Sequence, residues 1–78
     1  MDIKEFIVNF ANQFDDTELD VFMEDTCYHE LEEWSSLNAL AILNMIGKKY
    51  NVILKLDEMR QTNTVQELFD LVLSKKQK

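Results

Sequence analysis

The 78-residue chain has no proline, one glycine and one cysteine. Tight turns depend on proline and glycine, so their scarcity argues against a β-rich fold and favours helices. The single cysteine, Cys27, excludes an internal disulfide and a multi-cysteine metal site, and suits a reduced thiol in the cytosol. No apolar run approaches the ~20 residues of a membrane span, and the acidic first residues are unlike a signal or transit peptide. We therefore expect one soluble, cytoplasmic domain over residues 1–78.

Basic residues are scarce in the first part of the chain. Residues 1–35 hold eleven acidic residues against one lysine, whereas residues 36–56 hold three lysines and no acid. The whole chain has a net charge of -7. Such a field repels the phosphate backbone, so nucleic-acid binding is disfavoured, while basic protein surfaces are attracted. The charge alone does not show whether the acidic residues bind basic partners or only keep the protein soluble.

Apolar spacing predicts two amphipathic helices before residue 51. The first has about four turns and a phenylalanine-rich stripe at Ile3, Phe6, Ile7, Phe10 and Phe14. The second begins at Ser35 or Ser36, with Ser35 as a good N-cap, and ends near Tyr50, where Asn51 can close it in the left-handed conformation. Its inner face is expected at Leu37, Leu40, Leu43, Ile46 and Tyr50, widened by Ala41, Ile42 and Met45.

The rest of the chain predicts one short helix and one longer one. The apolar run at residues 52–54 has no partner strand, so we expect an extended link packed on the core. A short helix follows, from residue 58 to about residue 61. The last helix starts at a capping box, with Thr64 as the N-cap and Glu67 three residues later. The predicted fold class is all-α: a four-helix bundle of three long helices and one short helix, with a long first loop.

Residues 15–35 form this long acidic loop. Its acids lack the spacing and the central glycine of a calcium loop, so we predict no metal site. Six apolar residues are expected to pin the loop onto the bundle: Leu19, Val21, Phe22, Met23, Tyr28 and Leu31. His29 is the only histidine, and without a paired ligand or a close catalytic partner it is interpreted as a surface or loop residue.

No residue pattern indicates catalysis by the chain itself. A deep cleft is hard to build at this size, there is no glycine-rich phosphate loop, and the spacing does not support a triad of Ser36, His29 and an acid. Ser36 nevertheless has a distinctive setting, because free amides and the dipole at a helix start favour a negative group. A phosphodiester on its hydroxyl would be well placed, with Leu37 offering an apolar contact to a docking enzyme. The alternative is that Ser35 and Ser36 only cap the helix, and local physics alone favours that alternative.

The order of these features resembles the acyl carrier protein family, the phosphopantetheine-carrying four-helix domain. The family has Asp-Ser-Leu at the start of its second helix, where this chain has Ser35-Ser36-Leu37. The likeness covers nearly the full length. Further matching positions are Thr26, Tyr28 and Leu31 before the motif, Tyr50-Asn51-Val52 at the end of the second helix, and Asn63-Thr64-Val65 with Leu68 at the start of the last.

The resemblance implies a non-catalytic, monomeric carrier in fatty-acid or other lipid biosynthesis. A phosphopantetheinyl transferase would attach 4′-phosphopantetheine to the Ser36 oxygen, and acyl-loading and acyl-transferring enzymes would then exchange thioesters on its thiol. Candidate partner-recognition residues surround the serine: Glu32, Glu33, Trp34, Ser35 and Leu37. Candidate lining residues of an acyl pocket, which could equally be ordinary core, are Leu40, Ile46, Met59 and Val65.

Two departures from the family pattern change the expected partners. Ser35 replaces the usual aspartate, which would weaken recognition by a transferase or change the local magnesium environment. The second helix lacks the usual acids, which lie instead in the preceding loop at Glu30, Glu32 and Glu33. We therefore expect a dedicated pathway and poor coupling to general fatty-acid synthesis enzymes. Two other functions stay open: an acidic helical adaptor without the arm, and an aminoacyl or peptidyl carrier.

Overall fold

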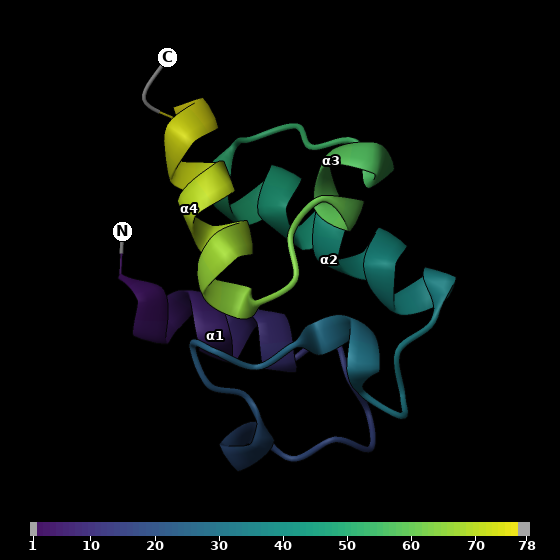
Figure 1. Cartoon of the computed structure of the whole chain (residues 1–78). Coiled ribbons are helices and arrows are strands. Elements are labelled where there is room, and N and C mark those ends of the chain that lie inside the picture. Colours follow the sequence, from purple (N-terminus) through teal and green to yellow (C-terminus); the bar gives the residue numbers. More distant parts are fainter. Residues whose placement is uncertain (1, 77–78) are drawn as a thin grey trace.

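Four α-helices and two short 3-10 turns make up the fold (Figure 1). The structure is a computed structural model and describes residues 2–76. In chain order the elements are α1 (Ile3–Ala11), η1 (Leu19–Val21), η2 (Tyr28–Glu30), α2 (Ser36–Tyr50), α3 (Leu56–Arg60) and α4 (Val65–Lys76). Within the described residues there is no β-strand, only an isolated antiparallel bridge between Cys27 and Thr64. The predicted all-α class with four helices is confirmed.

α1 is shorter than its apolar stripe suggests. It has nine residues and ends at Ala11, so the prediction of a helix continuing through Phe14 is wrong. After Ala11 the backbone tightens, because the amides of Gln13 and Phe14 donate to the carbonyls three residues earlier, at 3.1 and 3.0 Å. Phe14 is still buried, so its ring joins the stripe from a turn and not from the helix.

The bounds of α2 agree with the prediction, and its buried face agrees in part, since Ile42, Met45, Ile46 and Tyr50 are buried as predicted. Ser35 is the N-cap, and Asn51 ends the helix in the left-handed conformation with a φ of 57°. The sequence predicts Leu37 and Leu40 inside, and this is wrong, since they are 79% and 56% exposed. Figure 1 shows why: the first turns of α2 extend beyond α1 and α4, which cover only its later part. The buried face consists of Ala39, Ile42, Met45, Ile46 and Tyr50.

The segment between α2 and α3 is an extended link, as predicted. Val52 and Leu54 are buried, and Ile53 between them is 87% exposed. Side chains of an extended chain alternate in this way, which places one face of the link on the core. None of the helices in residues 2–76 is both long enough and apolar enough to span a bilayer.

Side-chain caps set the starts of the last two helices. α3 begins at Leu56, earlier than predicted, where the Glu58 carboxylate accepts from the Lys55 amide at 3.0 Å. The predicted capping box of α4 is confirmed. The Glu67 amide donates to Thr64 Oγ1 at 3.1 Å, and the Thr64 amide donates to Glu67 Oε1 at 3.2 Å.

Two residues of the long loop anchor it firmly on the core. Phe22 and Tyr28 are buried. Leu19, Val21 and Met23 lie exposed, so the prediction that they pin the loop is wrong. The reason is local: the two buried rings already fill the space beside α1, with the Phe22 ring in contact with aromatic rings of the α1 segment.

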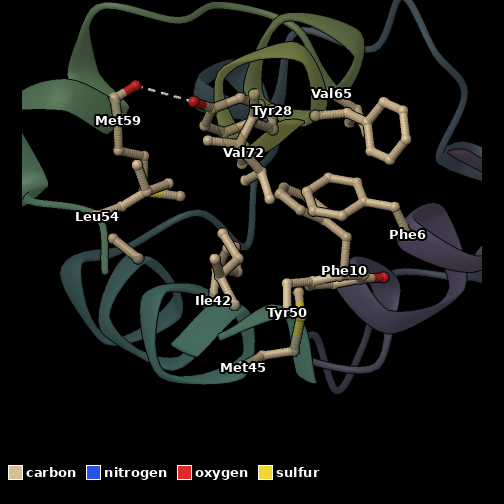
Figure 2. Close-up of a cluster of buried hydrophobic side chains, with 14 of the residues drawn as sticks. Phe6, Phe10, Tyr28, Ile42, Met45, Tyr50, Leu54, Met59, Val65 and Val72 are labelled. Atoms are coloured by element: carbon tan, nitrogen blue, oxygen red, sulfur yellow. Dashed lines mark hydrogen bonds between the residues drawn. The ribbon is translucent and has the colours of Figure 1, made fainter. Parts of the chain in front are cut away.

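Tyr28 connects the loop to α3 through its hydroxyl (Figure 2). The phenol oxygen lies 2.9 Å from the Met59 carbonyl oxygen and 3.2 Å from that of Thr62, both of which accept, and it also pairs with the Thr62 hydroxyl. Its ring is fully buried and packs edge-on against Phe10, with the centroids 5.4 Å apart. Burial raises the pKa of the Tyr28 hydroxyl, so it remains a donor at neutral pH. One side chain thus joins α1, the loop and α3.

We predict that Tyr28→Phe destabilises the protein and loosens α3. Removing the hydroxyl deletes a buried hydrogen bond, while the carbonyls of Met59 and Thr62 keep the Thr62 hydroxyl and His29 Nε2 as donors. The expected loss is therefore about 0.5–1.5 kcal/mol of the free energy of unfolding. Urea unfolding would measure the loss, and amide hydrogen exchange in residues 56–62 should accelerate. The matched control is Tyr50→Phe, since that buried hydroxyl accepts only from Asn9 Nδ2 at 2.9 Å and does not touch α3. Equal exchange rates of α3 in the two variants would contradict the prediction.

Candidate functional site

Ser36 is the first residue of α2, and its neighbour Ser35 does the capping. The Ser35 hydroxyl accepts from the Asn38 amide at 3.4 Å and donates to Asn38 Oδ1 at 2.8 Å. The Asn38 side chain donates to the Gln13 carbonyl at 3.2 Å, which ties the start of α2 to the turn after α1. Ser36 is exposed. The amides of Ser36 and Leu37 have no partner inside the helix, because they belong to its first turn.

The Glu33 carboxylate holds the first residues of the acidic loop. It accepts from the amides of residues 15, 16 and 17 at 2.8, 3.0 and 2.9 Å, and from the Thr17 hydroxyl at 2.7 Å. The Thr17 hydroxyl and these amides lower the pKa of the Glu33 carboxyl below its ordinary value of 4.5. Of the two glutamates predicted to face partners, Glu33 is therefore engaged within the chain, while Glu32 is exposed.

Trp34 and His29 form an aromatic corner next to Tyr28. Trp34, a predicted recognition residue, is half-buried, with its ring centroid 5.1 Å from that of Tyr28 and 5.2 Å from that of His29. His29 is also half-buried, and its Nε2 atom lies 2.9 Å from the Thr62 carbonyl oxygen, to which it donates. His29 is thus a loop residue, as interpreted from the sequence, and its ring also contacts the segment that follows α3.

A pocket of about 260 Å³ opens beside Ser36. The loop, α2 and α3 each contribute to its lining: His29 and Trp34 from the loop, Ser36 and Ala39 from α2, and Leu56, Met59 and Arg60 from α3. None of these lining residues is acidic, although the chain as a whole has a net charge of -7. The pocket thus brings together a hydroxyl, a guanidinium group and apolar walls.

Three of the four residues predicted to line an acyl pocket, Ile46, Met59 and Val65, belong to the buried core. Met59 lines the pocket beside Ser36. Ile46 and Val65 are fully buried in the core and do not line that pocket, and Leu40 is mostly exposed on α2. Ala39, the neighbour of Leu40 on α2, is buried and lines the pocket instead.

The site offers an exposed primary hydroxyl with no catalytic group bonded to it. Within residues 2–76 no hydrogen bond joins His29 to Ser36, and the Nε2 atom of His29 is already bonded to Thr62. The same residues hold no cluster of three or more His, Cys, Asp or Glu side chains that could bind a metal ion.

Sequence reasoning missed Arg60 and His29 as site residues. Arg60 ends a helix too short to show a periodic pattern, and His29 lies in the loop, where spacing gives no direction to a side chain. One signal was present in the composition, because Arg60 is the only arginine of the chain.

Comparisons with known proteins give no relative for the chain: no family model, curated protein or solved structure matches it. Any functional assignment therefore depends on the residue pattern around Ser36 and on the geometry of the pocket. Both are specific to this chain and can be tested directly.

We predict that Glu33→Gln lowers stability at neutral pH by weakening the bonds to residues 15–17. A carboxyl with a lowered folded-state pKa stabilises the fold fully above its unfolded-state pKa, near 4.5, and loses that contribution as the pH falls through the folded value. The difference between the variant and the unchanged protein should therefore be largest near pH 7 and shrink in acid. Urea midpoints measured across this pH range would show it.

Glu32→Gln is the matched control for this prediction, because it removes the same charge from the exposed neighbour. Its effect on the urea midpoint should be smaller at neutral pH. If both variants changed the midpoint equally at every pH, the hydrogen bonds of Glu33 would not be what holds the loop.

Proposed function

We propose that the protein is an acyl carrier, with the four helices forming an acyl-carrier-like bundle. Acyl intermediates would be carried as thioesters on a 4′-phosphopantetheine arm attached to Ser36. The observation that carries the proposal is the position of Ser36: an exposed hydroxyl on the first residue of α2, next to a pocket and relieved of capping by Ser35. Its role would be that of a substrate for partner enzymes and not that of a catalyst.

Attachment is a displacement at phosphorus. The Ser36 oxygen forms a bond to the phosphorus of coenzyme A that carries the pantetheine, and the bond from that phosphorus to the bridging oxygen breaks. Adenosine 3′,5′-bisphosphate leaves, and the proton of the Ser36 hydroxyl goes to a base of the transferase. When bound, the arm supplies a terminal thiol that holds an acyl group as a thioester.

The residues around Ser36 fit a phosphodiester at that position. The amides of Ser36 and Leu37 are free of intrahelical bonds, and the positive end of the α2 dipole favours negative charge there. The pocket beside Ser36 has no acidic lining residue that would repel the phosphate. Its apolar walls, including Met59 and Leu56, suit the methyl groups of the arm or the first carbons of a cargo.

An acidic helical adaptor without an arm is the alternative from another class. The exposed acids of the loop favour it, since they would suit a basic partner whether or not Ser36 is modified. An aminoacyl or peptidyl carrier would share the arm and differ only in its cargo.

We predict that the intact mass of the protein increases by one phosphopantetheine after incubation with coenzyme A and a permissive transferase. Ser36→Ala should abolish the gain. Ser35→Asp should keep it, because aspartate caps a helix as well as serine does and restores the residue that transferases usually meet. A gain in Ser36→Ala, or no gain in the unchanged protein with several transferases, would refute attachment at Ser36.

Partner choice should follow the exposed face of α2, which is apolar and basic. Leu37 and Leu40 are its exposed apolar residues, and Lys48 and Lys49 are its charges, with no acid between Ser36 and Tyr50. This face of α2 would fit a partner whose surface is apolar and not strongly basic, because Lys48 and Lys49 would repel positive charge. We propose that the carrier serves dedicated partners of this kind.

We predict that general fatty-acid synthesis enzymes with basic docking surfaces load and elongate this carrier poorly. Lys48→Glu should raise their kcat/KM severalfold and make it fall with added salt, because a charge at the rim of an interface acts mainly on the association rate. Lys4→Glu is the control, since it makes the same charge change at an exposed position of α1. Efficient coupling of the unchanged protein, or equal gains in both variants, would contradict the prediction.

A further inference from the structure

Arg60 is the only permanent charge in the lining of the pocket beside Ser36. It is exposed at the end of α3, and within residues 2–76 it takes part in no ion pair. The neighbouring acid of α3, Glu58, is already paired with Lys75 at 2.5 Å. In a chain with a net charge of -7, a lone cation at a pocket without acids marks a place where an anion can be bound.

Arg60 is the group of the pocket best suited to bind an anion, because the other polar groups are engaged or neutral. His29 has its Nε2 atom bonded to the Thr62 carbonyl, so that nitrogen cannot also donate to a ligand. Ser36 contributes a neutral hydroxyl. Trp34, Leu56 and Met59 supply apolar surface and no charge.

An arginine suits a phosphate better than it suits most other anions. The guanidinium group is planar and presents pairs of N–H donors that match two phosphate oxygens, and it keeps its charge at any physiological pH. The hydroxyl of Ser36 borders the same pocket, so a phosphate group on its oxygen would bring its negative charge to the rim that Arg60 shares.

We propose that Arg60 binds the phosphate group of the pantetheine arm and holds the first part of the arm against the Trp34 and Met59 side of the pocket. This inference rests on the proposed attachment to Ser36 and adds a positioning residue to it. Arg60 would reduce the freedom of the arm near its attachment point and leave the thiol end free. The ligand class is a phosphate ester bearing a pantetheine chain.

The first test uses the loaded protein, with loading verified by intact mass. The ³¹P resonance of the phosphodiester is compared in the unchanged protein, Arg60→Gln, Arg60→Lys and Lys48→Gln, at low salt and at about 1 M salt, where the screening length falls to about 3 Å. We expect Arg60→Gln to shift the resonance and to remove its dependence on salt. Arg60→Lys should keep part of the salt dependence, because it retains the charge without the paired donors. Lys48→Gln should behave as the unchanged protein does, since it removes a charge at the far end of α2.

The second test needs no loading. Free 4′-phosphopantetheine is titrated into the unmodified protein, and the resonances of the Ser36 and Leu37 amides and of the Arg60 side chain are followed. We expect saturable shifts that Arg60→Gln weakens at least severalfold and that pantetheine without the phosphate does not produce. Circular dichroism of each variant controls for folding.

The two tests separate this inference from the proposed function. A loaded protein whose ³¹P resonance and salt response are the same with and without Arg60 would overturn the phosphate site and leave the attachment standing. Failure of every transferase, together with Arg60-dependent binding of the free compound, would overturn the attachment and leave the site. No Arg60-dependent shift in the titration would overturn the site even if no loaded protein could be made.

Discussion

The hydrogen bonds of the Tyr28 hydroxyl are the contact on which the site depends. They join the loop that carries His29 and Trp34 to the carbonyls of Met59 and Thr62 at the end of α3. The loop and α3 form two of the walls of the pocket beside the start of α2. A single buried phenol therefore sets how far apart those walls lie. His29 reinforces the tie, because its Nε2 atom donates to the same Thr62 carbonyl at 2.9 Å.

Three of the fifteen acidic residues hold junctions of the chain itself. The carboxylates of Glu33, Glu58 and Glu67 each accept from backbone amides. The Thr17 hydroxyl and three amides lower the pKa of Glu33, Lys75 and one amide lower that of Glu58, and two amides lower that of Glu67. Each acid fixes a different junction: the loop after α1, the start of α3 and the start of α4. The lowered pKa keeps all three carboxylates ionised, so they stabilise the fold and still contribute to the negative charge of the chain.

Local signals predicted the caps of α2 and α4 correctly, but they did not predict which part of the apolar stripe of α2 is covered. Ser35, Asn51 and the Thr64–Glu67 box act within a few residues of themselves, so their geometry follows from the sequence alone. Leu37 and Leu40 have the spacing of an inner face. Whether such a face is buried depends on where the other helices end, which is a property of the tertiary structure and not of the local sequence. α1 also ends before the last residue of its apolar stripe, where the backbone tightens into a turn at Gln13 and Phe14.

The residues of the candidate site also fall into two groups, those predictable from a local motif and those placed by the tertiary fold. Ser36 could be predicted because it depends on a short motif at a helix start. Arg60 and His29 could not, because they reach the pocket only through the fold: α3 turns Arg60 toward α2, and the bond to Thr62 holds His29 in place. Residues that are brought to a pocket only by the tertiary fold show no characteristic spacing in the sequence.

α3 is the element whose movement would cost the least. It has five residues, too few for a stable helix by itself, and Met59 is its one buried residue. Withdrawing one methionine from the core exposes apolar surface worth about 1.5–3 kcal/mol, a cost that an apolar guest of similar size entering the same space would offset. Moving α1 or α4 would instead expose several buried rings and aliphatic side chains at once. A guest chain entering beside Ser36 would therefore part α3 from α2, and the hydrogen bonds of Tyr28 would set the resistance that it meets.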